Sequence, residues 1–224
     1  LQVQREGVIK IENFYQFENS QEIINLMNDN DKGKNKKILM DLANENSKNF
    51  LQKLLYYLSF IRGENYNPNQ LRLHFAAHKD ININDNFHTD LYSHYPKGYI
   101  YLHDVDIETR PFMYLLKSHN DYKVNKEIEK ITCKNLYYER SQFMNESSRL
   151  KENDDWDKYF DKFETFVGLA KKGDAIFADT SGFHRKGPGS KPRYAFWIQP
   201  KRGNLIKKLI SIFFLKKYIL DLKI

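Results

Sequence analysis

Two short stretches, far apart in the sequence, decide how the chain is interpreted. They are Phe87-His88-Thr89-Asp90 and Asp179-Thr180-Ser181-Gly182-Phe183-His184, the second followed nine residues later by Arg193. Together they supply two imidazoles, a carboxylate and a guanidinium. Two histidines and one carboxylate on one face of a metal form the ligand set of non-haem Fe(II) oxygenases, and a nearby cation suits an acidic co-substrate. The stretches therefore predict an iron site.

The spacing of the first stretch suits a shared metal. Side chains alternate along a strand, so His88 and Asp90 point to the same side while Thr89 faces elsewhere. A third ligand from a distant strand then closes a triangular face and leaves the opposite face open. A His-x-Asp pair alone often arises by chance. His184 and Arg193 strengthen the interpretation, because the planar guanidinium matches a carboxylate through two hydrogen bonds.

The rest of the chain predicts a mainly β domain preceded by helices. Apolar residues at helical spacing indicate helices over Gln21–Met27 and Ile38–Ile61, and Val8–Phe14 is expected to be a strand. From Gln70 onward, runs rich in aromatic and aliphatic residues indicate further strands. These runs are Leu71–Phe75, Gly98–Asp104, Phe112–Leu116, Asp174–Asp179 and Arg193–Gln199. Two more helices are expected, an insertion over Asn125–Leu150 and a second helix over Asp155–Ala170.

This order of elements favours a β-sandwich or jelly roll with N-terminal helical packing and a helical insertion. The 224 residues fit a single domain, 1–224, with a core at about 70–199 and a tail at 203–224. The tail mixes lysines with apolar residues. It could be a closing helix, a partner contact, an unstructured end or a segment on a membrane surface. Its longest apolar cluster, Leu209–Leu215, is too short to span a bilayer, so no stable membrane insertion is expected.

Composition narrows the possible partners. The formal charge is +7, but the 36 basic and 29 acidic side chains are interspersed. This pattern indicates solubility and some attraction for anionic ligands, and no nucleic-acid-binding motif is found. A basic interaction protein that binds nucleic acid or membranes is the least favoured hypothesis. Cys133 is the single cysteine, so no internal disulfide is possible and a reducing, cytoplasmic location is expected.

Additional segments occur in a fixed order between and after the two stretches. They are Lys97-Gly98-Tyr99-Ile100-Tyr101-Leu102-His103-Asp104-Val105, Arg110-Pro111-Phe112-Met113-Tyr114, Lys117-Ser118-His119 and Gly173-Asp174-Ala175-Ile176-Phe177-Ala178. No single segment is specific. Their order and spacing together resemble the phytanoyl-CoA dioxygenase-like family of Fe(II)/2-oxoglutarate oxygenases, over roughly Gln70–Gln199.

The resemblance implies a double-stranded β-helix, a form of jelly roll, that holds one Fe(II) and uses 2-oxoglutarate as co-substrate. By position, His88, Asp90 and His184 would be the catalytic iron ligands. Arg193 would bind the far carboxylate of 2-oxoglutarate, with Lys97 as a weaker candidate for the same pocket. The implied activity is hydroxylation of a small-molecule substrate, because Asp90 occupies the ligand position that related halogenases leave to a halide.

The sequence departs from the family in two turns. The usual Asn-Gly-Pro is Thr109-Arg110-Pro111, and the usual Gly-Ser-His is Lys117-Ser118-His119. Both turns lack their glycine, which leaves their backbone geometry open. A non-catalytic metal- or ligand-binding module on the same fold is therefore the alternative hypothesis. Neither the substrate nor the oligomeric state is predicted.

Other polar residues are expected to have structural roles. His74, His78, His94 and His103 are interpreted as surface or core residues, although His94 or His103 could line the cavity. Tyr92, Tyr99 and Tyr101 are interpreted mainly as packing residues, one of which could reach the co-substrate. Asp104 and Asp179 are expected to fix turns or support the ligands from behind.

Overall fold

The computed structural model describes residues 2–28, 47–62, 71–78, 86–90, 96–128, 150–151 and 154–200. Several predictions concern residues outside these ranges: the helix between Ile38 and residue 46, most of the insertion between Asn125 and Leu150, Tyr92, His94, Cys133 and the tail at 203–224. Among the described residues, no helix has both the length and the apolar character needed to cross a membrane.

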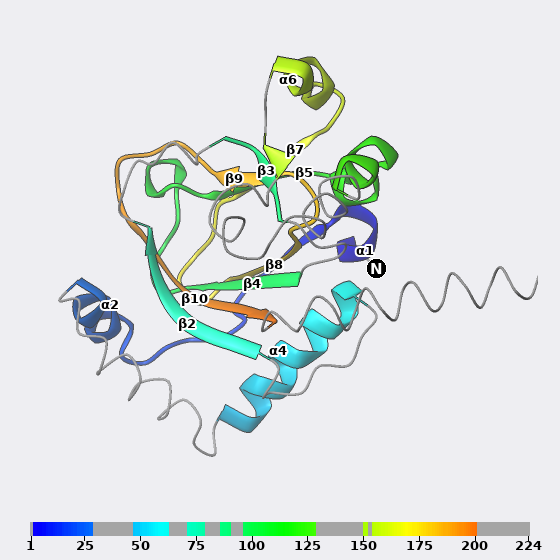
Figure 1. The fold of residues 1–224 in the computed structure, drawn as a ribbon. Coiled ribbons are helices and arrows are strands. Elements are labelled where there is room, and N and C mark those ends of the chain that lie inside the picture. The colour runs from blue at the N-terminus through cyan, green and yellow to red at the C-terminus, as the bar shows by residue number, and fades with distance from the viewer. Residues whose placement is uncertain are drawn as a thin grey trace, which may run out of the picture.

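The strands form two five-stranded antiparallel sheets (Figure 1). The first sheet has the order β1-β8-β4-β10-β2, with bounds Val8–Ile11, Ala175–Asp179, Pro96–Tyr101, Arg193–Pro200 and Leu71–His78. The second has the order β6-β3-β9-β5-β7, with bounds Leu150–Lys151, His88–Thr89, His184–Lys186, Phe112–Leu115 and Thr165–Gly168. The domain is therefore rich in antiparallel sheet, as the runs of strand-forming residues predict.

The chain passes repeatedly between the two sheets. From β2 to β5 successive strands alternate between the first and second sheet, β7 stays in the second, and β8, β9 and β10 alternate again. This path places strands that are distant in sequence beside each other, so that β3 pairs with β9 and β2 pairs with β10. The two stretches that suggest a metal site therefore become neighbours.

Aromatic side chains form part of the core between the sheets. Alternation along β4 directs Tyr99 and Tyr101 into this inner core, while Ile100 packs with the helices on the other side. Tyr99 of the first sheet contacts Phe112 of the second, with ring centroids 5.2 Å apart. This packing sets the separation of the sheets and gives the site a rigid floor.

Helices cover the outer face of the first sheet, as predicted. These are α1 (Gln2–Glu6), α2 (Ser20–Asn28) and α4 (Ser47–Arg62), and Figure 1 shows α4 lying across the sheet. Leu54 and Leu58 of α4 are fully buried in one cluster with Ile100, Phe177 and Phe196. Full burial of each leucine contributes about 2 kcal/mol, which explains the apolar stripe at helical spacing.

Several boundaries differ from the sequence prediction; for example, β2 continues to His78 rather than Phe75, and β4 ends at Tyr101 rather than Asp104. The expected helix over Asp155–Ala170 is wrong in its second half: α6 covers only Asp154–Phe160, and β7 (Thr165–Gly168) follows. The Thr165-Phe166-Val167 run pairs along its whole length with β5, and this ladder outweighs the weak helical periodicity. The first strand ends at Ile11 rather than Phe14 because Asn13 adopts a left-handed backbone, with φ of 49°.

Two short 3-10 helices complete the described fold. η3 (Ile107–Thr109) and η4 (Ser118–Asn120) flank β5. Asp106 caps η3, since its carboxylate accepts hydrogen bonds from the backbone N–H groups of Glu108 and Thr109. Residues 122–128 are helical, so the described start of the predicted insertion is a helix, whereas its last residue, Leu150, lies in strand β6. α6 follows β6 and lies at the β7 end of the second sheet (Figure 1).

Candidate metal centre

The fold brings His88, Asp90 and His184 together. His88 on β3 and His184 on β9 are direct partners in the ladder, and their ring centroids are 4.5 Å apart. Asp90 follows β3, and its Oδ2 lies 3.8 Å from His184 Nε2. One ligand atom from each residue lies within 4.8 Å of the others. These distances suit three ligands on one face of a metal ion.

Both imidazoles are oriented by backbone carbonyls. Nδ1 of His88 lies 3.0 Å from the Asn86 carbonyl oxygen, and Nδ1 of His184 lies 3.0 Å from that of Gly182. A carbonyl oxygen can only accept, so each Nδ1 carries a proton and each Nε2 presents its lone pair. This is the arrangement that supports metal-binding histidines.

The buried His184 is held in its neutral form. Burial lowers its pKa well below the ordinary 6.5, and the neighbouring His88 lowers it further. Since only the neutral imidazole binds a metal, this shift favours coordination at neutral pH. The ring also stacks on Phe112, with centroids 5.7 Å apart, which restricts its orientation.

The turn before His184 is shaped by close packing. Gly182 lies against Tyr114 and Ser118, and a Cβ at this position would overlap the Tyr114 hydroxyl. Ser118 Oγ accepts a hydrogen bond from Phe183 N at 2.8 Å. The lack of a side chain at Gly182 therefore allows the second stretch to approach β5 and place His184 opposite His88.

Lys97 lies at the metal end of the inner face. Its Nζ is 2.5 Å from Asp90 Oδ2, and both residues are buried. The same ammonium group lies 5.2 Å from the centroid of the Trp197 ring. Lys97 therefore contacts a proposed iron ligand directly. This contact argues against a role for Lys97 in binding the far carboxylate of 2-oxoglutarate.

Arg193 is buried at the start of β10. Its Nη1 donates a 2.7 Å hydrogen bond to the Arg110 carbonyl, and its guanidinium carbon lies 6.0 Å from the Tyr99 ring centroid. Among the described residues, no carboxylate pairs with Arg193, and its Nε has no hydrogen-bond partner. A buried guanidinium in this state favours an anion from outside the chain.

Tyr101 supplies a second polar group near Arg193. Its hydroxyl is fully buried and makes no hydrogen bond to any described residue. Burial raises the pKa of Tyr101, and the charge of Arg193 acts in the opposite direction. Tyr101 is therefore a neutral hydroxyl close to a buried cation, and together they suit one carboxylate of a small dianion.

The two turns without glycine keep a left-handed backbone. Arg110 has φ of 57° and Lys117 has φ of 67°. The Arg110 carbonyl accepts a hydrogen bond from Arg193, so the first turn helps to hold the buried Arg193 guanidinium in place. The substitutions place side chains in a backbone region that favours glycine, yet the chain follows the turns.

Other candidates lie outside this centre. His103 Nε2 accepts a hydrogen bond from Tyr194 N, whereas His119 Nε2 lies 3.1 Å from the Gln4 carbonyl in α1. Asp104 contacts Lys171 and Lys172, and Asp179 accepts two hydrogen bonds from Ser181. These contacts are structural, in agreement with the sequence interpretation.

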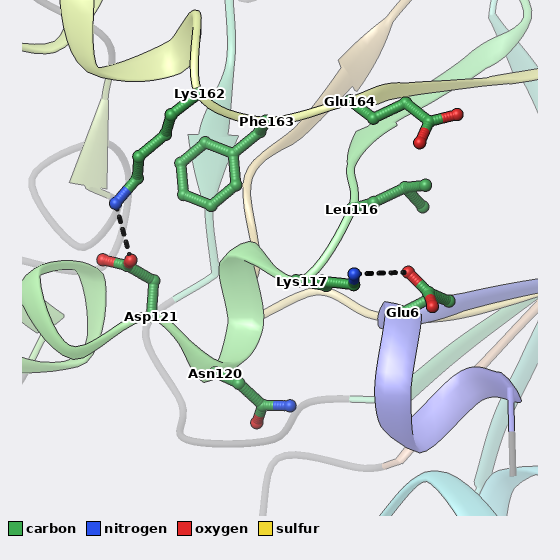
Figure 2. Close-up of a pocket in the computed structure, with 8 residues that line it drawn as sticks. All are labelled: Glu6, Leu116, Lys117, Asn120, Asp121, Lys162, Phe163 and Glu164. Atoms are coloured by element: carbon green, nitrogen blue, oxygen red, sulfur yellow. Dashed lines mark hydrogen bonds and ion pairs between the residues drawn. The ribbon is translucent and has the colours of Figure 1, made fainter.

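A surface cleft of about 520 Å³ lies apart from the three proposed ligands (Figure 2). It is lined by Glu6, Leu116, Lys117, Asn120, Asp121, Lys162, Phe163 and Glu164. Lys162 pairs with Asp121 at 2.8 Å, and Lys117 lies 4.0 Å from Glu6. Because both lysines of the cleft have carboxylate partners there and no proposed ligand lines it, the chemistry is assigned to the inner face.

Comparisons with known proteins agree with the fold. The sequence matches no protein-family model, and no curated protein is significantly similar to it. Solved structures with a similar fold include proteins with 2-oxoglutarate bound and one described as a non-haem, 2-oxoglutarate-dependent carbocyclase. Membership of the phytanoyl-CoA dioxygenase-like family therefore stays a prediction.

Three of these structures illustrate the similarity. HygX from Streptomyces hygroscopicus, with nickel and 2-oxoglutarate bound, has a TM-score of 0.52 at 13% identity, covering 89% of this chain and 84% of HygX. EvdO2 from Micromonospora carbonacea var. aurantiaca, complexed with 2-oxoglutarate, has a TM-score of 0.51 at 11% identity, covering 89% of both chains. The carbocyclase SnoK from nogalamycin biosynthesis has a TM-score of 0.53 at 11% identity, covering 88% and 81%.

Proposed function

We propose that this protein is an Fe(II)- and 2-oxoglutarate-dependent dioxygenase that hydroxylates a small-molecule substrate. The observation that carries the proposal is the convergence of His88, Asp90 and His184, with ligand atoms within 4.8 Å of one another, in a domain that also buries Arg193 without a described carboxylate partner. The neighbouring structures support the cofactor pair, since HygX binds nickel and 2-oxoglutarate and EvdO2 binds 2-oxoglutarate.

The residues divide into two groups along the inner face. His88, Asp90 and His184 would hold Fe(II) through Nε2, a carboxylate oxygen and Nε2. Arg193 would bind the far carboxylate of 2-oxoglutarate, assisted by the Tyr101 hydroxyl. Lys97 forms an ion pair with Asp90, so we assign Lys97 to the metal end of the pocket rather than to the Arg193 end.

The protein's own residues position and protect the reaction. When bound, Fe(II) and 2-oxoglutarate together supply the oxidation of a C–H bond by O₂, with release of succinate and CO₂. Phe112 and Tyr99 pack behind His184 and exclude water from that side. Asp90 contributes the carboxylate that distinguishes a hydroxylase from a halide-binding site. SnoK is described as a carbocyclase, so other oxidative outcomes occur on this fold.

We also propose that the two sheets form a double-stranded β-helix. The support is the strand path, in which the chain crosses between sheets so that β2, β10, β4 and β8 adjoin in one sheet and β3, β9, β5 and β7 in the other. A jelly roll has eight strands in two such sheets. The proposal therefore accounts for all of these strands, with β1 and β6 as added edges.

One observation favours a second candidate, a non-catalytic binding module. Lys97 already neutralises the buried Asp90 carboxylate, so this carboxylate has a positive charge beside it even when no metal is bound. A module of this kind would bind its ligand but would not consume 2-oxoglutarate. Turnover-dependent formation of succinate from 2-oxoglutarate would exclude it.

An anaerobic optical titration tests the main proposal. Apo-protein receives Fe(II) and then 2-oxoglutarate, beside a His184→Ala variant. A weak visible charge-transfer band in the parent alone would establish the chelated co-substrate. A folded, iron-loaded parent without this band would contradict the assignment of 2-oxoglutarate and favour the binding module.

A further inference from the structure

Along β2, β10 and β4, the described residues on the inner face of the first sheet include cations at both ends and no acidic side chain. Ladder partners share a face, so His74, Trp197 and Tyr99 form one row across β2, β10 and β4. The next row on this face lies two residues further along each strand, on the side of Asp90. It consists of Arg72, Gln199 and Lys97. Arg193 lies in the opposite direction, where it pairs with His78.

The row of rings forms a continuous aromatic surface of tilted rings next to these cations. The His74 and Trp197 rings have centroids 5.0 Å apart, and Trp197 and Tyr99 have centroids 5.6 Å apart. Lys97 Nζ lies over the Trp197 ring. Such a surface suits the planar or apolar body of a small molecule, because aromatic rings stack in offset and tilted arrangements.

Two positive charges, those of Arg72 and Lys97, act on His74 in this surface. Burial, together with the charges of Arg72 and Lys97, lowers its pKa from 6.5 to about 4. His74 is therefore neutral at physiological pH, and its buried Nδ1 has no hydrogen-bond partner among the described residues. The position adds a polar atom without adding a third charge.

The charges of the loaded site would leave an excess of positive charge. The two charges of Fe(II) would be balanced by the 2-oxoglutarate dianion, and Lys97 is balanced by Asp90. The charges of Arg193 and Arg72 then make the sum positive, although Arg193 would contact 2-oxoglutarate, and no described residue forms an ion pair with Arg72. The inner-face positions on β8 are Ile176 and Ala178, which add no charge, and Lys10 on β1 has its own carboxylate partners in Glu12 and Asp174. A face with this excess of positive charge attracts an anion.

The position of Arg72 separates it from the co-substrate pocket. Arg72 and the partner of Arg193, His78, are six residues apart on β2, about 20 Å along an extended strand. A guanidinium at the Arg72 end can bind a carboxylate or phosphate through two hydrogen bonds. The two arginines therefore suit two different anions.

We propose that Arg72, with Lys97 behind it and Trp197 and His74 as its aromatic surface, binds an anionic group of the substrate, so that the substrate is a carboxylate or phosphate ester with a flat or apolar body. This inference rests on the proposed oxygenase function. It places the anionic group of the substrate at the end of the same face that lies near the metal.

Fluorescence of Trp197 provides a direct binding test. The chain has two tryptophans, so a Trp156→Phe background isolates Trp197. The anaerobic protein, loaded with Fe(II) and saturating 2-oxoglutarate, is titrated with benzoate, phenyl phosphate and the neutral benzamide. The anions are expected to change the emission of Trp197 and to bind at least about tenfold more tightly than benzamide.

Variants test whether Arg72 is responsible for the preference for anions over benzamide. The exposed Arg72→Met is expected to weaken binding of the anions about tenfold and to leave benzamide unchanged. Lys158→Met removes an exposed positive charge from α6 and serves as the matched control, with no expected change. Comparison of benzoate with phenyl phosphate decides which anion the site prefers.

The outcomes separate this inference from the proposed function. If the charge-transfer band forms but anions bind no better than benzamide, or Arg72→Met changes nothing, the anion site is wrong and the oxygenase assignment stands. If anions bind through Arg72 but no band ever forms, the anion site is supported and the oxygenase assignment is wrong.

Discussion

Lys97 Nζ lies 2.5 Å from Asp90 Oδ2, and each residue is less than a tenth exposed. A buried carboxylate requires a nearby positive charge, and this pair supplies one before any metal binds. A metal ion at Asp90 would bring a second cation to the same group. The stability of the fold and metal binding are therefore coupled through one carboxylate.

The first prediction follows from this coupling. Lys97→Met should lower the free energy of unfolding of the metal-free protein by about 3 kcal/mol, because Asp90 stays buried without its counter-charge. Saturating Ni(II) should restore much of the loss, since the metal replaces the lost cation. Urea unfolding with and without Ni(II) measures both effects, with Lys158→Met as control. An equal loss in both conditions would contradict the coupling.

The second prediction concerns the two histidines as ligands. His88→Ala and His184→Ala should each weaken Ni(II) or Co(II) binding at least about a hundredfold, because two ligands remain on the face. His103→Gln removes an imidazole outside the centre and should leave the affinity unchanged. Calorimetric titration of the metal-free proteins provides the comparison. Unchanged affinity in either alanine variant would exclude that histidine as a ligand.

Much of this arrangement could be predicted from residue types and spacing. Alternation of side chains placed His88 and Asp90 on one side of a strand, and the structure adds His184 as the direct ladder partner of His88. The strands from Leu71 to Pro200 also carry strong aromatic and aliphatic signals. These features depend on local pattern, which a single sequence contains.

Features that depend on long-range packing could not be predicted. The β7 segment is a strand because β5 offers it a partner, not because its own pattern excludes a helix. The contact of Lys97 with Asp90 and the bond from Arg193 to the Arg110 carbonyl each join separate elements. The row of His74 and Trp197 depends on the register between β2 and β10, which sequence spacing does not reveal.

A third prediction concerns the pH dependence of stability. Burial lowers the pKa of His74 from 6.5 to about 4, so below pH 6.5 the unfolded chain binds a proton that the folded protein does not. The free energy of unfolding should therefore fall as the pH decreases from about 6.5 to about 4. In His74→Gln this part of the decrease should be smaller. Identical pH profiles of unfolding for both proteins would contradict the shift.

A fourth prediction tests the strained turn at Lys117. This exposed residue has φ of 67°, and glycine adopts this backbone without a Cβ clash. Lys117→Gly should raise the free energy of unfolding by up to about 1 kcal/mol, because relief of strain exceeds the extra entropy of the unfolded chain. Asn120→Gly, in η4 and with no positive φ, should be destabilising. Thermal unfolding of the two variants would show opposite shifts; a decrease for both would contradict the prediction.

A fifth prediction separates binding from stability at Arg193. The guanidinium is buried with no described carboxylate, so its loss removes an unfavourable buried charge along with one hydrogen bond to Arg110. Arg193→Met should change the free energy of unfolding by less than about 1 kcal/mol. Its affinity for 2-oxoglutarate, measured with Ni(II) present, should fall about a hundredfold, because a charge-assisted double hydrogen bond is lost.

The neighbouring Tyr101 distinguishes this role from simple packing. Tyr101→Phe keeps the ring and removes only the buried hydroxyl, which has no described hydrogen-bond partner. It should weaken 2-oxoglutarate binding about fivefold without destabilising the fold. If Arg193→Met instead lost several kcal/mol of stability and kept its affinity for 2-oxoglutarate, Arg193 would be a structural residue, and the co-substrate carboxylate would have to bind elsewhere on the inner face.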